Sequence, residues 1–106
     1  MIKSGIDIIQ VNRVSLEDSF VRKVLHEEEI NMLNLKISVD EKKQFLAGRW
    51  AAKEAIFKAQ NHTIGYNKFN IKLIDGQLKV ESELKVNISL SISHEKEYAV
   101  ALALVE

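Results

Sequence analysis

The sequence lacks cysteine and proline altogether, and only four of its 106 residues are glycine. The absence of cysteine excludes disulfides, thiolate metal sites and a cysteine nucleophile. No apolar run approaches the ~20 residues of a membrane-spanning helix, and no signal-peptide pattern begins the chain. We therefore expect a cytoplasmic protein without a membrane partner.

An excess of charge is also missing, because 15 basic residues balance 15 acidic ones. Domains that bind nucleic acid usually carry a clear basic excess, so no nucleic-acid partner is expected. Attraction to a charged partner must therefore come from a local patch. With 46% hydrophobic and 28% charged residues, the composition is that of a globular protein, and the length fits a single domain over residues 1–106.

The apolar patterns predict an α+β fold with a long helix packed on a mainly antiparallel sheet. Strands are expected at residues 1–11, 69–74, 78–80, 84–92 and 98–105. Helices are expected in the latter part of 12–25, at 27–35 and from an N-cap at Asp40 to about residue 60. Asp75-Gly76 is a hairpin turn signal. Residues 98–105 are apolar on both faces, which indicates a central strand.

One acid interrupts the first strand. Ile2, Ile6 and Ile8 alternate with Gly5 and Asp7, and the strand otherwise looks buried. Asp7 is either satisfied by backbone N–H groups at a strand end or belongs to a functional site. The residues of the strand alone leave both interpretations open.

The long helix carries charges in an alanine-rich run, FLAGRWAAKEAIFK at residues 45–58. Glu54 and Lys58 lie one turn apart on one face, so they form either an ordinary i,i+4 pair or part of an active-site floor. Because the helix is apolar on nearly all sides, it needs cover on nearly all sides. We expect another chain to supply some of that cover.

Three short motifs occur in a characteristic order: Gly5-Ile6-Asp7, the run WAAKEA at 50–55 followed by Lys58, and SISH at 91–94. Together they resemble the phosphopantetheinyl transferases. The short chain and the early G-I-D motif resemble the small holo-[acyl-carrier-protein] synthase type of that family. The resemblance covers essentially the whole chain.

The resemblance implies a reaction of fatty acid biosynthesis. The 4′-phosphopantetheine group of coenzyme A (CoA) is transferred to a serine of an acidic apo acyl carrier protein, releasing adenosine 3′,5′-bisphosphate. It also implies a homotrimer with sites at subunit interfaces and a Mg²⁺ cofactor held by Asp7 and Glu54. Magnesium takes few protein carboxylates and bridges substrate phosphates, which suits this pair. Lys58 completes the implied catalytic set, and a site carboxylate or a metal-bound water could remove the serine proton.

The resemblance further implies two sets of binding residues. For CoA they are Arg49, Lys53, Lys58, Thr63, Ile64, Gly65, Ser91, Ser93 and His94. For the carrier protein they are Arg13, Arg22 and Lys23. Simpler interpretations stay open: a turn histidine at 94, a solvent-facing strand at Ser91 and Ser93, and a solvated basic helix face.

The loop at residues 60–64 departs from the family, whose members usually carry a glycine-rich segment there. Only Gly65 is kept, and Thr63 would adopt a left-handed conformation poorly. Two other functions therefore stay open. One is a module that binds a nucleotide or a carrier protein without chemistry, and the other is a purely structural subunit.

Overall fold

Helix α3 (Val39–Ala59) is the longest element of the computed structural model, which describes residues 1–106. The strands are β1 (Lys3–Gln10), β2 (Asn70–Ile74), β3 (Gln77–Glu81), β4 (Ile88–His94) and β5 (Tyr98–Val105). Two short helices, α1 (Asp18–Val24) and α2 (Glu27–Asn34), precede α3. Single 3₁₀ turns, η1 (Val11–Arg13) and η2 (Tyr66–Lys68), follow β1 and α3.

The main sheet has the strand order β1-β5-β4, and both pairings are antiparallel. The prediction that residues 98–105 form a central strand is therefore confirmed. Strands β2 and β3 form a separate hairpin, as the Asp75-Gly76 signal predicted. Both turn residues have positive φ, 52° and 78°, the conformation that a tight two-residue hairpin turn requires.

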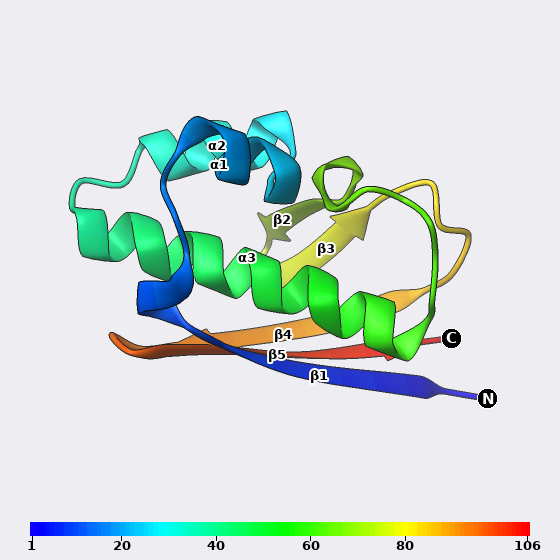
Figure 1. The fold of residues 1–106 in the computed structure, drawn as a ribbon. Helices are drawn as coiled ribbons and strands as arrows, with labels where there is room; N and C mark the ends of the chain where they lie inside the picture. Colours follow the sequence, from blue (N-terminus) through cyan, green and yellow to red (C-terminus); the bar gives the residue numbers. More distant parts are fainter.

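The inner face of the sheet packs against α3, with the helix running along the strands (Figure 1). Ala99, Ala101 and Ala103 of β5 are buried beneath the helix and allow it to come close. β1 approaches closest at Gly5, where an added Cβ would lie 2.0 Å from the carbonyl oxygen of Ala55. This close approach brings the next inward-facing residue of β1, Asp7, to the surface of α3.

The expectation that another chain covers α3 is wrong, because the chain covers its own helix. α1, α2 and the β2–β3 hairpin lie on the side of α3 away from the sheet (Figure 1). The apolar surface left open is instead the outer face of the sheet, which no element of this chain covers. Its exposed side chains are Ile6, Ile8, Tyr98, Leu102 and Leu104.

The isoleucines of the first strand were expected to be buried, and the structure exposes them. Ile6 and Ile8 are 61% and 60% exposed, whereas Gly5, Asp7 and Ile9 face α3. Alternation fixed the two faces of the strand but not which face meets the core. The isoleucines lie outward because only glycine fits beneath the helix at position 5.

Two predicted boundaries also need correction. The N-cap of α3 is Ser38, whose Oγ accepts a hydrogen bond from the Glu41 N–H (3.1 Å), and Asp40 lies inside the first turn. The fourth predicted strand begins at Ile88 rather than residue 84, because its partner β5 ends at Val105, which is paired with Ile88. The same strand continues through His94, which was expected in the turn.

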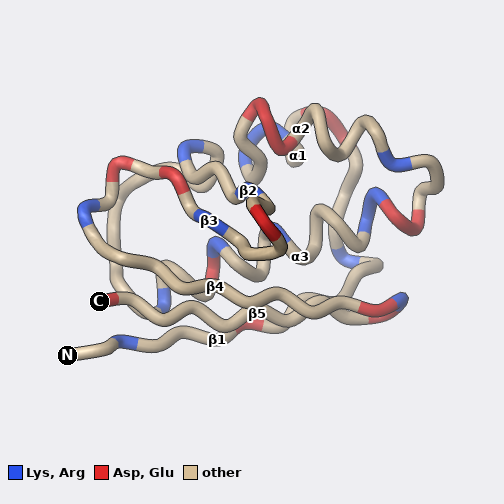
Figure 2. Tube along the Cα trace, turned by 180° about the vertical axis from the view of Figure 1, so that it is seen from behind, with Lys and Arg blue, Asp and Glu red and all other residues tan.

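No helix combines the length and the apolar character that a membrane crossing requires. Basic and acidic residues are both spread over the whole trace, and neither sign is concentrated at one end of the molecule (Figure 2). Charged chemistry in this molecule therefore depends on small local groups.

Candidate functional site

The first group of charged residues lies where β1 crosses the C-terminal half of α3. Lys58 Nζ is 2.9 Å from Asp7 Oδ1 and donates to the carbonyl oxygen of Ile6 at 3.0 Å. The Asp7 side chain is only 14% exposed, whereas that of Lys58 is 53% exposed. The lysine therefore forms a link between strand and helix rather than a pair with Glu54.

The second oxygen of Asp7, Oδ2, is buried and has no hydrogen-bond partner. Buried carboxylate oxygens are normally satisfied, so an unpaired one indicates room for a ligand. Glu54 and Asp7 also act on the same neighbour, Tyr66 of η2. Burial raises the pKa of Tyr66 to about 12, with contributions from the charge of Glu54, a side-chain hydrogen bond with Glu54 and the charge of Asp7. The charges of both acids thus raise the pKa of the same phenol, and we call Asp7, Glu54, Lys58 and Tyr66 the acidic site.

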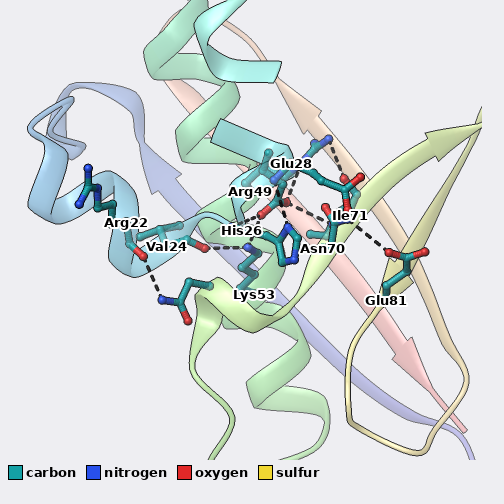
Figure 3. Close-up of polar contacts among 11 residues, drawn as sticks. Arg22, Val24, His26, Glu28, Arg49, Lys53, Asn70, Ile71 and Glu81 are labelled. Carbon is teal, nitrogen blue, oxygen red and sulfur yellow. Dashed lines mark hydrogen bonds and ion pairs between the residues drawn. The ribbon is translucent and has the colours of Figure 1, made fainter. Parts of the chain in front are cut away.

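A second group of charges is enclosed between α2, α3 and β2 (Figure 3). Glu29 is fully buried and pairs with both Lys53 Nζ and Arg49 Nε, the latter at 3.1 Å. Lys53 also donates to the carbonyl oxygen of Val24 at 2.7 Å. We call Glu29, Arg49 and Lys53 the buried triad.

Burial lowers the pKa of both cations of the triad, and the charge of Glu29 opposes that shift. For Lys53 the result is a pKa of about 8. Lys53 is only 1% exposed, and its ammonium group already contacts Glu29 and Val24. Its ammonium therefore does not reach the protein surface, where a CoA phosphate would bind. Arg49 differs, because it lines a cavity.

That cavity, of about 660 Å³, is lined by Arg49, the β2–β3 hairpin and β4. His94 and Ser91 also line it, and His94 Nδ1 lies 2.8 Å from Gln44 Oε1. His94 is on the helix-facing side of β4, opposite Ala99, whereas Ser91 and Ser93 alternate onto the outer face. Gln44 and Lys58 are separated by roughly 21 Å of helix, so this cavity and the acidic site are distinct on one chain.

The loop after α3 has a framework of aromatic side chains in place of glycines. Its only glycine, Gly65, has φ −60°, and no residue of the loop has positive φ, so Thr63 is not strained. His62 lies among rings, with centroids 4.8 Å from Phe69 and 5.4 Å from Phe57. Its Nδ1 accepts the Ile64 N–H at 3.2 Å. The segment Thr63–Gly65 is therefore held next to Tyr66 and the acidic site.

Two of the three basic residues predicted to bind a carrier protein are on α1, which contacts η2 next to the acidic site. Arg13 ends η1, whereas Arg22 and Lys23 are in the last turn of α1. All three are exposed, and Arg22 pairs with Asp18 at 3.1 Å. They form an accessible basic surface with a weak internal ion pair.

Residues 3–103 match the family model described as the 4′-phosphopantetheinyl transferase superfamily. The chain belongs to that superfamily.

Similar transferases include the holo-[acyl-carrier-protein] synthase of Mycoplasma capricolum, which is 45% identical over 100 residues, 94% of this chain and 90% of the relative. The enzyme of Oceanobacillus iheyensis is 38% identical over 112 residues, 96% of this chain and 93% of the relative. Among solved structures, the Bacillus anthracis holo-(acyl-carrier-protein) synthase in complex with CoA (3′,5′-ADP) has TM-score 0.88 and 34% identity, covering 98% of this chain and 95% of that one. The predicted family and α+β fold are therefore confirmed.

The acidic site of this transferase-superfamily member fits a magnesium ion. No group of three or more histidine, aspartate or glutamate side chains is placed to hold a metal. Magnesium does not need one, because it keeps several waters and takes one or two carboxylates plus substrate phosphates. The unpaired Oδ2 of Asp7 and the carboxylate of Glu54 supply such a donor set.

Sequence reasoning missed Glu29, His62 and Tyr66. Glu29 was one of three acids assigned to a helix N-terminus, and it does cap α2 by accepting the His26 N–H at 2.9 Å. Nothing in the local pattern distinguishes it from Glu27 and Glu28, which stay exposed. Tyr66 and His62 offered a weak signal, as aromatic residues in a segment predicted to be a polar loop.

Proposed function

We propose that this protein is a holo-[acyl-carrier-protein] synthase. It transfers the 4′-phosphopantetheine group of CoA to a serine hydroxyl of an acidic apo acyl carrier protein and releases adenosine 3′,5′-bisphosphate. The observation that carries the proposal is the unpaired buried oxygen of Asp7, an acid that acts with Glu54 on the pKa of the same tyrosine, Tyr66 of η2. The family of the chain and the shared names of its relatives support the same reaction.

In this reaction the serine oxygen forms a bond to the phosphorus that bears the pantetheine arm. The bond from that phosphorus to the leaving phosphate breaks, and the serine proton is released. Positioning and charge neutralisation carry most of the catalysis of phosphoryl transfer. Asp7 and Glu54 would hold Mg²⁺, which when bound neutralises charge on the CoA pyrophosphate.

The other residues of the acidic site have complementary tasks. Lys58 holds Asp7 in place through Oδ1 and brings a mobile positive charge to the phosphates. Tyr66 stays protonated at neutral pH, because burial and the charge of Glu54 raise its pKa to about 12, so its hydroxyl can donate to a carboxylate or a substrate phosphate. Thr63, Ile64 and Gly65 lie beside this site and form one wall for CoA.

The remaining CoA contacts come from the separate cavity, with Arg49, Ser91 and His94, and from Ser93 on the outer face of the sheet. Since that cavity and the acidic site are distinct on one chain, one CoA molecule would use them most simply across a boundary between copies. The uncovered apolar face of the sheet offers an association surface. We therefore include a homotrimer with interfacial sites in the proposal, in the cytoplasm.

Arg13, Arg22 and Lys23 are the proposed docking surface for the carrier. Their exposure permits contact with an acidic partner, and rim charges of this kind raise association rates more than they lower off-rates. Replacing the three with glutamine should raise KM for the carrier without changing KM for CoA.

The decisive experiment is a mass measurement on the carrier. The protein is incubated with CoA, Mg²⁺ and apo acyl carrier protein, and the carrier is weighed over time. We expect the mass of one phosphopantetheine to appear and EDTA to prevent it. A carrier that stays unmodified here, while another transferase modifies it, would exclude the proposal; magnesium-dependent CoA binding without turnover would point to a binding module instead.

A further inference from the structure

Both carboxylate oxygens of Glu29 have polar partners. Oε1 contacts Lys53 Nζ and accepts the His26 N–H at 2.9 Å. Oε2 lies 3.1 Å from Arg49 Nε and accepts the Ile71 N–H at 3.3 Å. One buried carboxylate thus joins α2, α3 and β2.

Arg49 is the member of the buried triad that reaches a cavity wall. One terminal nitrogen donates to the carbonyl oxygen of Ile71 at 3.4 Å, and the guanidinium carbon lies 4.5 Å from the ring centre of Phe45. Figure 3 shows the side chain of Arg49 directed from α3 toward Ile71 at the start of the hairpin. Nε forms an ion pair with Glu29 Oε2 without hydrogen-bond geometry, so Glu29 holds the guanidinium mainly through its charge.

The triad also has an excess of charge. Two cations share one carboxylate, so one positive charge remains uncompensated inside the protein. Lys53 is enclosed, and Arg49 lines the cavity beside His94 and Lys79. A guanidinium held in a cavity wall can bind a phosphate monoester through two parallel hydrogen bonds, which a surface lysine cannot do.

We propose that Glu29 is a positioning residue, which fixes Arg49 so that its guanidinium recognises the 3′-phosphate monoester of CoA in the cavity beside β4. This inference rests on the proposed function. It assigns to Glu29 a task in substrate discrimination in addition to its contribution to packing. The pKa directions agree with it, since burial alone would favour the neutral form of Arg49 and the charge of Glu29 opposes that.

The test compares CoA with dephospho-CoA, which lacks only the 3′-phosphate, in the carrier modification assay. The variant is Glu29→Gln, which keeps the size of the side chain and removes its charge. The control is Glu28→Gln, the preceding acid, which is exposed and does not contact Arg49. Melting temperature and oligomeric state are measured for every protein.

We expect the wild type and Glu28→Gln to prefer CoA by at least about tenfold in kcat/KM, the effect of one charge-assisted contact. In Glu29→Gln the preference should fall to within about twofold of unity, through a higher KM for CoA at nearly unchanged kcat. A purely structural role would reduce kcat/KM for both substrates equally and keep their ratio. A folded Glu29→Gln protein with the wild-type ratio, or a wild type without any preference, overturns the inference.

If Glu29→Gln does not fold, two milder variants give the answer. Glu29→Asp keeps the charge but withdraws it by one methylene, and Arg49→Lys keeps the positive charge but loses the planar fork. Both should narrow the preference for CoA, and an unchanged preference in both overturns the inference. Failure of the proposed function is distinguishable, because then the wild type would not modify the carrier with CoA at all.

Discussion

Helix α3 carries two groups of acid and base that differ in how completely they are satisfied. In the buried triad, Glu29, Arg49 and Lys53 are enclosed, and both oxygens of the carboxylate are engaged by partners of the same chain. In the acidic site, Lys58 is half exposed and Asp7 keeps one oxygen without a partner. The two groups use the same residue types and lie on one helix.

The difference shows how one helix can hold charge for two purposes. Enclosed charges must be paired, because an unpaired buried ion costs several kcal/mol, and paired charges fix the positions of the elements that carry them. A carboxylate that keeps one oxygen without a partner can still bind a ligand, and its ion pair with a half-exposed lysine contributes little to stability. We therefore expect substitutions in the triad to affect folding first and substitutions in the acidic site to affect turnover first.

The largest expected effect is on stability in the triad. Glu29→Ala leaves two buried cations without their carboxylate and should lower the free energy of unfolding by about 3–5 kcal/mol. Urea denaturation measures it. Glu28→Ala, at an exposed position, should cost about 1 kcal/mol or less. Equal losses in the two variants would mean that the triad is no more important than a surface pair.

The next effect is on turnover in the acidic site. Asp7→Ala and Glu54→Ala should each reduce kcat/KM at least about 10²-fold, because each removes a ligand of the proposed metal. The melting temperature and oligomeric state should stay close to those of the wild type. Asp40→Ala, an exposed acid in the first turn of α3, serves as the control. Unfolding of both site variants would instead support a structural role for the two acids.

A third prediction concerns the approach of β1 to α3, on which the position of Asp7 depends. The Cβ of Gly5→Ala would meet the Ala55 carbonyl oxygen at 2.0 Å, so strand and helix must separate. We expect a loss of about 1–3 kcal/mol in the free energy of unfolding together with reduced turnover. In Gly65→Ala the nearest atom is the flexible Oδ1 of Asn67 at 3.1 Å, and stability should change less. Full activity in a destabilised Gly5→Ala protein would separate the packing of β1 from the chemistry.

The smallest effect is a pH dependence that only the buried triad should show. The pKa of Lys53 falls from its ordinary value of 10.5 to about 8 in the folded protein, mainly through burial. Between these values the unfolded chain binds a proton that the folded chain has lost, so the contribution of Lys53 to stability rises with pH. Relative to Lys53→Met, the wild type should gain about 1 kcal/mol from pH 9 to pH 10, measured by urea denaturation. A difference that stays constant over this interval would contradict the prediction.

Much of the fold can be predicted from patterns among residues that are close together in the sequence. Asp75-Gly76 specified a hairpin, and the apolar residues on both faces of 98–105 specified a central strand. The order of the three motifs indicated the family before any coordinates. Of the site, the pairing of Asp7 with Glu54 came from that resemblance, and the structure gives both acids a common neighbour in Tyr66.

Other features could not be inferred, because they depend on which surfaces meet. Arg49 and Lys53 were expected at CoA, and both contact Glu29, a residue that looked like an ordinary helix-terminal acid. For Lys58, a pair with Glu54 one turn away was one of two open interpretations, and its contact is instead with Asp7, 51 positions earlier. Part of the hydrophobic cover of α3 was expected from another chain, whereas the main sheet, α1 and α2 of the same chain supply most of it.

The amino-acid order alone thus specified the elements, their turns and the types of residue available for chemistry, because periodicity and turn conformation depend on adjacent residues. Only the tertiary structure determines which charged side chains are buried and paired and which keep an atom free for a ligand. That selection depends on desolvation and on the exact approach of distant segments, such as β1 to α3 at Gly5, and neither is encoded in any short stretch of sequence.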